Sequence, residues 1–222
     1  MRKSTALTIG AVVLAAGTGI IWSRREQIAS MLELLRLNRA AREFYNEYEH
    51  LDRDVIFHPE MEPRLDVYAP PAGDGHPVLL FLHGGSWSSY HKELFAPVAM
   101  RMLPGPMVVV IPDYSLYPKA TYETMTHEAA AAISWTLDNI QDYGGDPARL
   151  VVAGHSSGAH LGALALTDPG YLAAYGHGSE EVCGFIGLSG VYDVQAEADF
   201  WQAKGTEPRL IRAVMDGEEN YP

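Results

Sequence analysis

Residues 149–167 hold the feature that most constrains the fold of this chain. An apolar run of the kind seen in buried strands leads into the turn Gly154-His155-Ser156-Ser157-Gly158, and a stretch rich in small residues follows at once. The pattern Gly-x-Ser-x-Gly between a strand and a helix forms a sharp turn that lifts the serine hydroxyl clear of the sheet. The segment therefore predicts a strand–turn–helix unit and a serine nucleophile, Ser156, for acyl transfer.

The rest of the domain alternates strand-like and helix-like segments. Residues 65–68 read as a short strand, and two longer segments, 92–103 and 124–143, have the length and composition of helices. Four unbroken apolar runs predict strands buried on both faces: Val78–Leu82, Met107–Ile111, Leu150–Ala153 and Val182–Leu188. This alternation predicts an α/β fold with a mostly parallel sheet and helices on both faces.

A second glycine-rich turn, His83-Gly84-Gly85-Ser86-Trp87, follows the first of these buried strands. Paired glycines expose backbone N–H groups and allow a ligand to approach closely. An oxyanion formed on attack by Ser156 needs such donors, and the amide after the nucleophile, that of Ser157, supplies one of them. The order of the two motifs, each at the end of a buried strand, favours an esterase-type chemistry.

Six segments carry a resemblance to a known family: Leu65–Tyr68, His83–Trp87, Pro112–Pro118, Tyr143–Pro147, Gly154–Leu161 and Ser189–Asp193. The chain resembles the α/β-hydrolases, in particular the esterase branch with a His-Gly-Gly-x-Trp loop. It is most similar there to prenylcysteine methylesterases and kynurenine formamidases. The resemblance implies a Ser156 nucleophile and an oxyanion hole formed by the amides of Gly84, Gly85 and Ser157. It implies a carboxylic ester as substrate, or a small amide as in an arylformamidase, and no cofactor.

The remaining members of a catalytic triad are harder to place. In this fold the acid and then the histidine follow the serine, yet only His160 and His177 lie downstream of Ser156. His160 is expected on the helix after the turn, and His177 in a solvent-exposed loop. The resemblance makes Asp193 a structural residue. The triad acid and base are therefore expected beyond Pro222, with the C-terminal strands of the fold missing, and a catalytically incomplete scaffold is an alternative to a hydrolase.

Several other residues have structural interpretations. Asp113 is expected to fix its loop by hydrogen bonds, and His83 to support its own loop. Trp87, Tyr114 and Tyr117 fit either the wall of an acyl pocket or the core. The single cysteine, Cys183, is expected to be a small buried hydrophobe, and the spacing of cysteines and histidines predicts no metal site.

Composition excludes one class of partner. The formal net charge is −12, whereas nucleic-acid-binding proteins present a basic face. The partners expected are thus a small ester or amide substrate and a membrane. Nothing in the sequence indicates an oligomeric state.

The membrane expectation comes from the N-terminus. Residues 4–22 carry no charge and are bounded by basic residues on both sides. As a helix they would span roughly 28 Å, close to the hydrocarbon core of a bilayer. Residues 1–25 are therefore expected to form a single-pass transmembrane helix, and a cleaved signal peptide of a secreted protein is the alternative. Residues 26–54 are expected to form an amphipathic juxtamembrane helix, and residues 55–222 the hydrolase domain.

Overall fold

The computed structural model of this chain describes residues 39–205 and 208–217. It divides into two units, residues 1–46 and 47–222, of which the second contains the whole sheet. Residues 39–47 are helical, in line with the helix expected in this region. The expected transmembrane segment, residues 4–22, lies outside the described residues. Within the described ranges, no helix has the length and apolar character needed to cross a bilayer.

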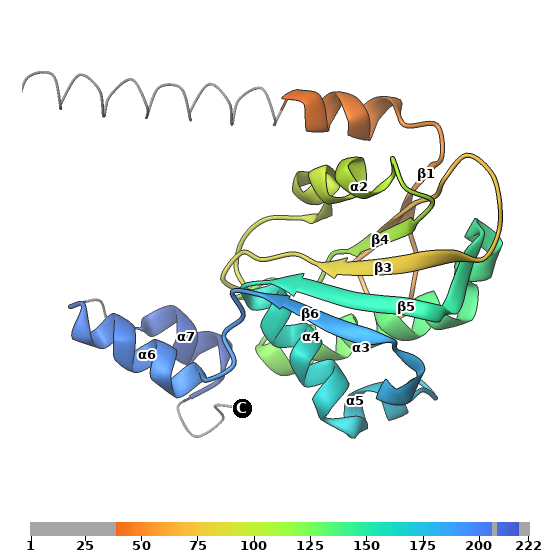
Figure 1. Cartoon of the computed structure of the whole chain (residues 1–222). Coiled ribbons are helices and arrows are strands. Elements are labelled where there is room, and N and C mark those ends of the chain that lie inside the picture. Colours follow the sequence, from red (N-terminus) through yellow and green to blue (C-terminus); the bar gives the residue numbers. More distant parts are fainter. Residues whose placement is uncertain (1–38, 206–207, 218–222) are drawn as a thin grey trace, which may run out of the picture. The chain divides into compact units, whose positions relative to one another are not determined.

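The second unit is built on a six-stranded sheet in the order β1-β2-β4-β3-β5-β6 (Figure 1). Four neighbouring strands, β4, β3, β5 and β6, run parallel. At one side of the sheet, β2 is antiparallel to both of its neighbours, β4 and β1. The strands are β1 (Leu51–Val55), β2 (Leu65–Tyr68), β3 (His76–Leu82), β4 (Val108–Pro112), β5 (Gly145–His155) and β6 (Gly184–Leu188). The expected α/β fold is thus confirmed, with a mixed sheet.

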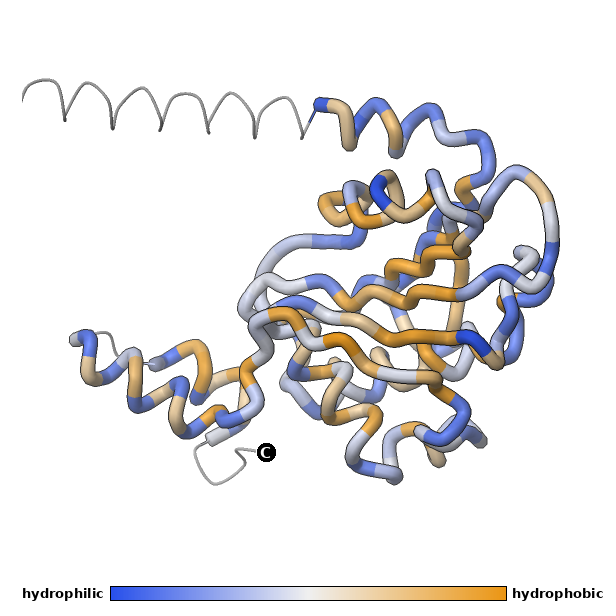
Figure 2. Tube along the Cα trace, viewed as in Figure 1, coloured by the Kyte–Doolittle hydropathy of each residue, from blue (hydrophilic) through white to orange (hydrophobic). Residues whose placement is uncertain are grey.

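Hydrophobic residues concentrate in the sheet, as Figure 2 shows. All five residues of β4 are buried, as are the last five of β3. Strands covered on both faces carry no alternation of polar and apolar residues, and this is why continuous apolar runs identified β3 and β4. The expectation that Val182–Leu188 is buried on both faces is wrong, because β6 stands at the edge of the sheet and its last three residues are exposed. On one face of the sheet, the core side chains pack against α3 (Tyr122–Asn139) and α4 (Ser157–Thr167).

Helices cover both faces of the sheet (Figure 1). On one face lie α3, α4 and α5 (Pro169–Ala173), and the run of alanines at 129–132 lets α3 approach closely. On the other face, the segment expected as one helix is a 3₁₀ turn, η1 (Lys92–Phe95), followed by α2 (Ala96–Met102). Short 3₁₀ turns also follow α3 and precede β6: η2 (Ile140–Tyr143) and η3 (Ser179–Glu181).

Two further helices, α6 (Val194–Ala203) and α7 (Arg209–Val214), lie beyond the carboxyl ends of β5 and β6 (Figure 1). Asp193 caps α6, because its side chain accepts a hydrogen bond from the amide of Ala196 at 2.8 Å. An aspartate at this position satisfies one of the free N–H groups at a helix start. The structural role expected for Asp193 is confirmed.

The prediction of a helix over residues 26–54 is wrong at the C-terminal end of this range. Residues 51–55 form β1, which pairs antiparallel with β2. The sequence Leu-Asp-Arg-Asp-Val has three exposed charged residues in its middle, so it lacks the apolar pattern of a buried strand. Charged side chains are common on edge strands because they discourage pairing with other chains.

Two residues near β6 also differ from expectation. Cys183 is exposed rather than buried, and its thiol donates to the carbonyl of Ala148 at 2.9 Å. The side chain of His177 is only 12% exposed, because it lies between Asp138 and Glu181 at 3.3 and 3.1 Å. Burial lowers the pKa of His177, but the hydrogen bonds to the two carboxylates outweigh burial and leave this pKa raised.

Candidate active site

Ser156 occupies a strained position between β5 and α4. Its backbone has φ 51° and ψ −119°, a conformation that few non-glycine residues adopt. Gly158 makes the turn sterically feasible, because a Cβ there would lie 2.3 Å from the carbonyl oxygens of Leu82 and His83. The amide of Ser156 donates to the carbonyl of Leu188 at 2.8 Å. The end of β3, the turn and the end of β6 are thereby locked together.

The glycine loop after β3 lies directly against this turn. A Cβ on Gly84 would lie 2.6 Å from Nδ1 of His155 and 3.2 Å from Cβ of Ser156. Gly85 has φ +147°, and a Cβ there would collide with the carbonyl of Ser89. The next two residues, Ser86 and Trp87, also have positive φ angles, 50° and 55°. Backbone strain of this kind clusters at functional sites.

The predicted oxyanion residues are therefore neighbours of Ser156. Gly84, Gly85 and Ser156 together line a cavity of about 310 Å³. Ser157 is the first residue of α4, and the first amides of a helix have no partner within the helix. Such amides attract negative charge, because the helix dipole is positive at this end.

His83 supports the glycine loop through contacts of its imidazole ring. Its Nδ1–H donates to the carbonyl of Gly84 at 2.9 Å, and its ring stacks on Tyr114 with a centroid distance of 4.5 Å. Its Nε2 lies 3.4 Å from Oδ1 of Asp113, which accepts a hydrogen bond from the amide of Lys92 at 2.7 Å. The loop-supporting roles expected for His83 and Asp113 are confirmed.

Tyr114 belongs to the same support. Its hydroxyl donates to the carbonyl of His83 at 2.8 Å and lies 3.3 Å from Oγ of Ser157. Burial raises the pKa of Tyr114, with a smaller opposing effect of the Ser157 hydrogen bond. The side chain therefore stays neutral and keeps its donor. Of the two interpretations of Tyr114, packing in the core is the one that applies.

A buried ion pair anchors the beginning of η1. Nζ of Lys92 lies 3.1 Å from Oδ1 of Asp66 and 2.7 Å from Oδ1 of Asp54. The side chain of Lys92 is 3% exposed and that of Asp66 is fully buried. Because the amide of Lys92 also donates to Asp113, this pair connects β2 to the support of the glycine loop. Lys92 carried no signal in the sequence that would distinguish it from a surface lysine.

Trp87 and His160 contact each other behind the nucleophile. The indole N–H of Trp87 donates to Nδ1 of His160 at 3.3 Å, and both side chains are buried. Burial lowers the pKa of His160 to about 4, so the ring is neutral at pH 7. Among the described histidines, none forms a hydrogen bond with the Ser156 hydroxyl.

A second cavity, of about 410 Å³, lies on the other side of Ser156. Trp87 and Ser156 line it, together with residues of α6 and α7 and of the segments just before these two helices. These residues are Val191, Glu197, Trp201, Pro208, Leu210 and Ile211. The lining is mostly apolar, as in pockets that bind small organic ligands.

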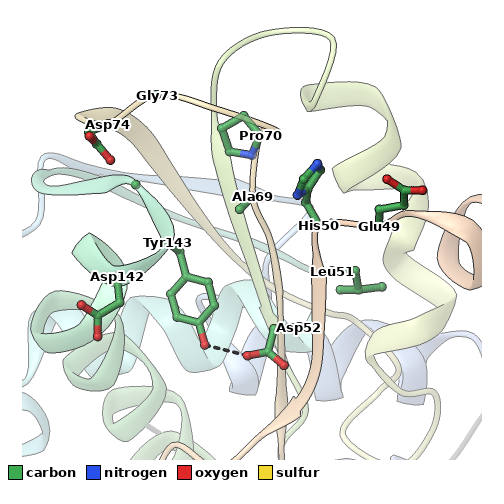
Figure 3. Close-up of a pocket in the computed structure, with 11 residues that line it drawn as sticks. Glu49, His50, Leu51, Asp52, Ala69, Pro70, Gly73, Asp74, Asp142 and Tyr143 are labelled. Carbon is green, nitrogen blue, oxygen red and sulfur yellow. Dashed lines mark hydrogen bonds between the residues drawn. The ribbon is translucent and has the colours of Figure 1, made fainter.

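Another cavity, of about 500 Å³, lies at the opposite end of the sheet (Figure 3). It opens near the starts of β1 and β5 and carries four acidic side chains: Glu49, Asp52, Asp74 and Asp142. The Tyr143 hydroxyl donates to Oδ2 of Asp52 at 2.9 Å. Burial, followed by this hydrogen bond, raises the pKa of Tyr143 to about 12. No cluster of the described residues has the composition of a metal site.

The fold and the serine turn define an α/β-hydrolase of the esterase type. Esterase B from Lactobacillus rhamnosis has the same fold, with a TM-score of 0.66, 16% identity, and coverage of 86% of this chain and 65% of that chain. Thermogutta terrifontis esterase 2 aligns with a TM-score of 0.59 and 22% identity, over 75% of this chain and 66% of its own.

Within this class the chain belongs to the BD-FAE family, whose model matches residues 65–214. An isoprenylcysteine alpha-carbonyl methylesterase of Arabidopsis thaliana is 30% identical over 174 residues, which are 76% of this chain and 41% of that protein. The esterase LipQ of Mycobacterium tuberculosis is 32% identical over 158 residues, 68% of this chain and 38% of LipQ. The chain thus spans about two fifths of the length of these relatives.

Proposed function

We propose that this chain carries the nucleophile and the oxyanion hole of a carboxylic-ester hydrolase. The observation that supports the proposal most strongly is the position of Ser156 between two cavities. One contains the glycine loop and the other is apolar. An ester carbonyl placed at Ser156 would direct its oxygen toward the amides of Gly84, Gly85 and Ser157, and its acyl chain toward Trp87 and α6.

In the proposed reaction, Oγ of Ser156 attacks the carbonyl carbon, and the π electrons of the C=O bond move onto oxygen. The resulting oxyanion accepts hydrogen bonds from the three amides, each of which typically contributes about 2.7–4 kcal/mol to the stability of the transition state. Collapse of this intermediate breaks the bond to the alcohol and leaves an acyl-serine, which water then hydrolyses. The proposal assigns no described residue as the acid or the base that moves the protons.

The proposed substrate class is a methyl ester of a prenylated cysteine. Several relatives carry the name isoprenylcysteine methylesterase, and the apolar wall formed by Val191, Leu210 and Ile211 suits a hydrocarbon group. We further propose that residues 4–22 anchor the protein in a membrane as a single span, since their length and lack of charge suit a bilayer. A prenylated substrate partitions into the same phase.

Hydrolysis of two esters by the chain and by Ser156→Ala tests this proposal. The expected result is release of acid from S-farnesylcysteine methyl ester and from p-nitrophenyl butyrate above the rates of the Ser156→Ala variant. Equal rates for the two proteins would overturn the assignment of Ser156. Hydrolysis of the butyrate ester alone would overturn the prenylcysteine substrate class and leave the esterase assignment in place.

A further inference from the structure

The apolar cavity beside Ser156 contains one carboxylate. Of the described residues that line it, Glu197 alone carries a formal charge. The side chain projects from the first turn of α6 and is half-buried. Its Oε1 accepts a hydrogen bond from the indole N–H of Trp201 at 2.7 Å. Its Oε2 forms no hydrogen bond with any described residue, which leaves it available as an acceptor for a group bound in the cavity that Glu197 lines.

Two tryptophans accompany this carboxylate. Trp87 is 4% exposed, and its indole is held by His160. Trp201, from α6, is held by Glu197 itself and is 42% exposed. Both rings line the same cavity as Ser156. The face of an indole ring attracts cations, and aromatic side chains combined with a carboxylate are a recurrent arrangement for binding quaternary ammonium groups.

Most of the other residues that line the cavity are apolar. Val191, Leu210 and Ile211 offer no hydrogen-bond donors or acceptors from their side chains. A cation brought next to the Glu197 carboxylate is attracted by its charge. A second carboxylate in the same cavity would instead be repelled.

We propose that this cavity selects esters whose acyl part carries an ammonium group, with Glu197 as the counter-ion and the two tryptophans as its aromatic walls. The inference rests on the proposed function, because it places the acyl part of the substrate on the Trp201 side of Ser156. The α-ammonium group of an unblocked amino-acid ester belongs to this class. Half-esters of dicarboxylic acids are excluded.

A pair of isosteric esters tests the inference. The p-nitrophenyl esters of 4-(trimethylammonio)butanoic acid and 5,5-dimethylhexanoic acid differ in charge and hardly in shape. The chain is expected to hydrolyse the cationic ester with a kcat/KM about 10-fold higher, a preference worth about 1.4 kcal/mol. Glu197→Gln keeps an oxygen for Trp201 but removes the charge, and should bring the ratio close to one. Asp199→Asn removes an exposed charge from the same helix outside the cavity and should leave the ratio unchanged.

An unchanged preference in Glu197→Gln, or no preference in the parent chain, would overturn the inference. A binding measurement separates this outcome from failure of the proposed function. In the Ser156→Ala background, choline should quench tryptophan fluorescence saturably, and its carbon isostere 3,3-dimethylbutan-1-ol should bind at least 10-fold more weakly. Adding Glu197→Gln should remove the difference. Glu197-dependent choline binding without any ester hydrolysis would contradict the esterase proposal alone, and hydrolysis of both esters at equal rates would contradict the charge selection alone.

Discussion

The indole N–H of Trp87 donates to Nδ1 of His160 across 3.3 Å, and this contact joins the glycine loop after β3 to the helix that begins beside Ser156. The bond requires that Nδ1 be unprotonated, so the neutral ring carries its proton on Nε2. The loop residues leading to Trp87 have positive φ angles, a strain that costs of order 1–3 kcal/mol per residue. Contacts that hold Trp87 in place therefore help to maintain the geometry of the loop.

Acidification should weaken the fold through His160. Its pKa is about 4 in the folded chain, because burial disfavours the charged ring, against 6.5 in a solvated histidine. The unfolded chain therefore binds more protons between these values. The contribution of neutral His160 to the free energy of unfolding is therefore fully present above about pH 6.5. It is lost as the pH falls toward 4, and the loss amounts to about 3 kcal/mol. Urea unfolding of the parent and of His160→Asn, which keeps an acceptor near Nδ1 without titrating, should show a smaller loss in the variant. Identical losses would rule out His160 as the source.

Gly84→Ala should impair the site with little effect on the distant fold. The new methyl group would meet His155 at 2.6 and 2.9 Å and Cβ of Ser156 at 3.2 Å, so the loop must move away from the nucleophile. Displacing one oxyanion donor typically lowers the rate 10²–10³-fold, and we expect a loss of about 10² in the rate of acylation of Ser156. Gly184→Ala is the matched control, since a Cβ there meets nothing within 4 Å. Equal rates for both variants would contradict a role of Gly84 beside Ser156.

Lys92→Met should destabilise the domain by about 3–5 kcal/mol, because it leaves the fully buried carboxylate of Asp66 without this partner. Adding Asp66→Asn should recover a large part of the loss. Lys119→Met serves as a control: its pair with Glu62 is exposed on both sides, and such pairs contribute at most about 1 kcal/mol. Chemical denaturation of the four proteins measures these differences. A loss below 1 kcal/mol for Lys92→Met would show that the buried pair does not anchor η1.

The face of β6 that points toward α2 should promote self-association of the chain. Ile186 and Leu188 are 51% and 48% exposed, and with Leu79, Phe81 and residues of α2 they line an apolar cavity of about 490 Å³. Exposed apolar strands at a sheet edge favour pairing with other chains. The double variant Ile186→Thr/Leu188→Thr keeps residues that are compatible with a strand and makes this face more polar. It should lower the weight-average mass that analytical ultracentrifugation measures at high protein concentration. A mass that does not depend on these substitutions would contradict this expectation.

Much of the sheet could be predicted from the sequence, because β3, β4 and β5 each contain a continuous apolar run. The turn at Ser156 and the glycine loop were recognisable for a related reason. Each needs glycine where a Cβ would collide with backbone, as at Gly158. Steric constraints of this kind are visible in the local sequence, because they require glycine at one position. The structural role of Asp193 followed from the resemblance to known esterases, and in the structure its side chain caps α6.

Other features depend on contacts between distant segments. β1 is charged, and only its pairing with β2 makes it a strand. The partners of Lys92 come from residues 38 and 26 positions earlier in the chain, Asp54 and Asp66, and no local pattern connects them. Likewise the wall formed by Glu197 and Trp201 becomes visible only when α6 is placed beside Ser156. The burial of His177 likewise depends on Asp138, which lies far from it in the sequence, together with Glu181.

Labelling with a fluorophosphonate tests the central claim, that Ser156 is the nucleophile, most directly. Attack of its Oγ on phosphorus displaces fluoride and leaves a stable adduct whose mass and position can be read by peptide mass spectrometry. We expect one adduct per folded chain, located on Ser156, and none in Ser156→Ala. A folded chain that stays unmodified under prolonged exposure, or an adduct that persists in Ser156→Ala, would contradict the claim.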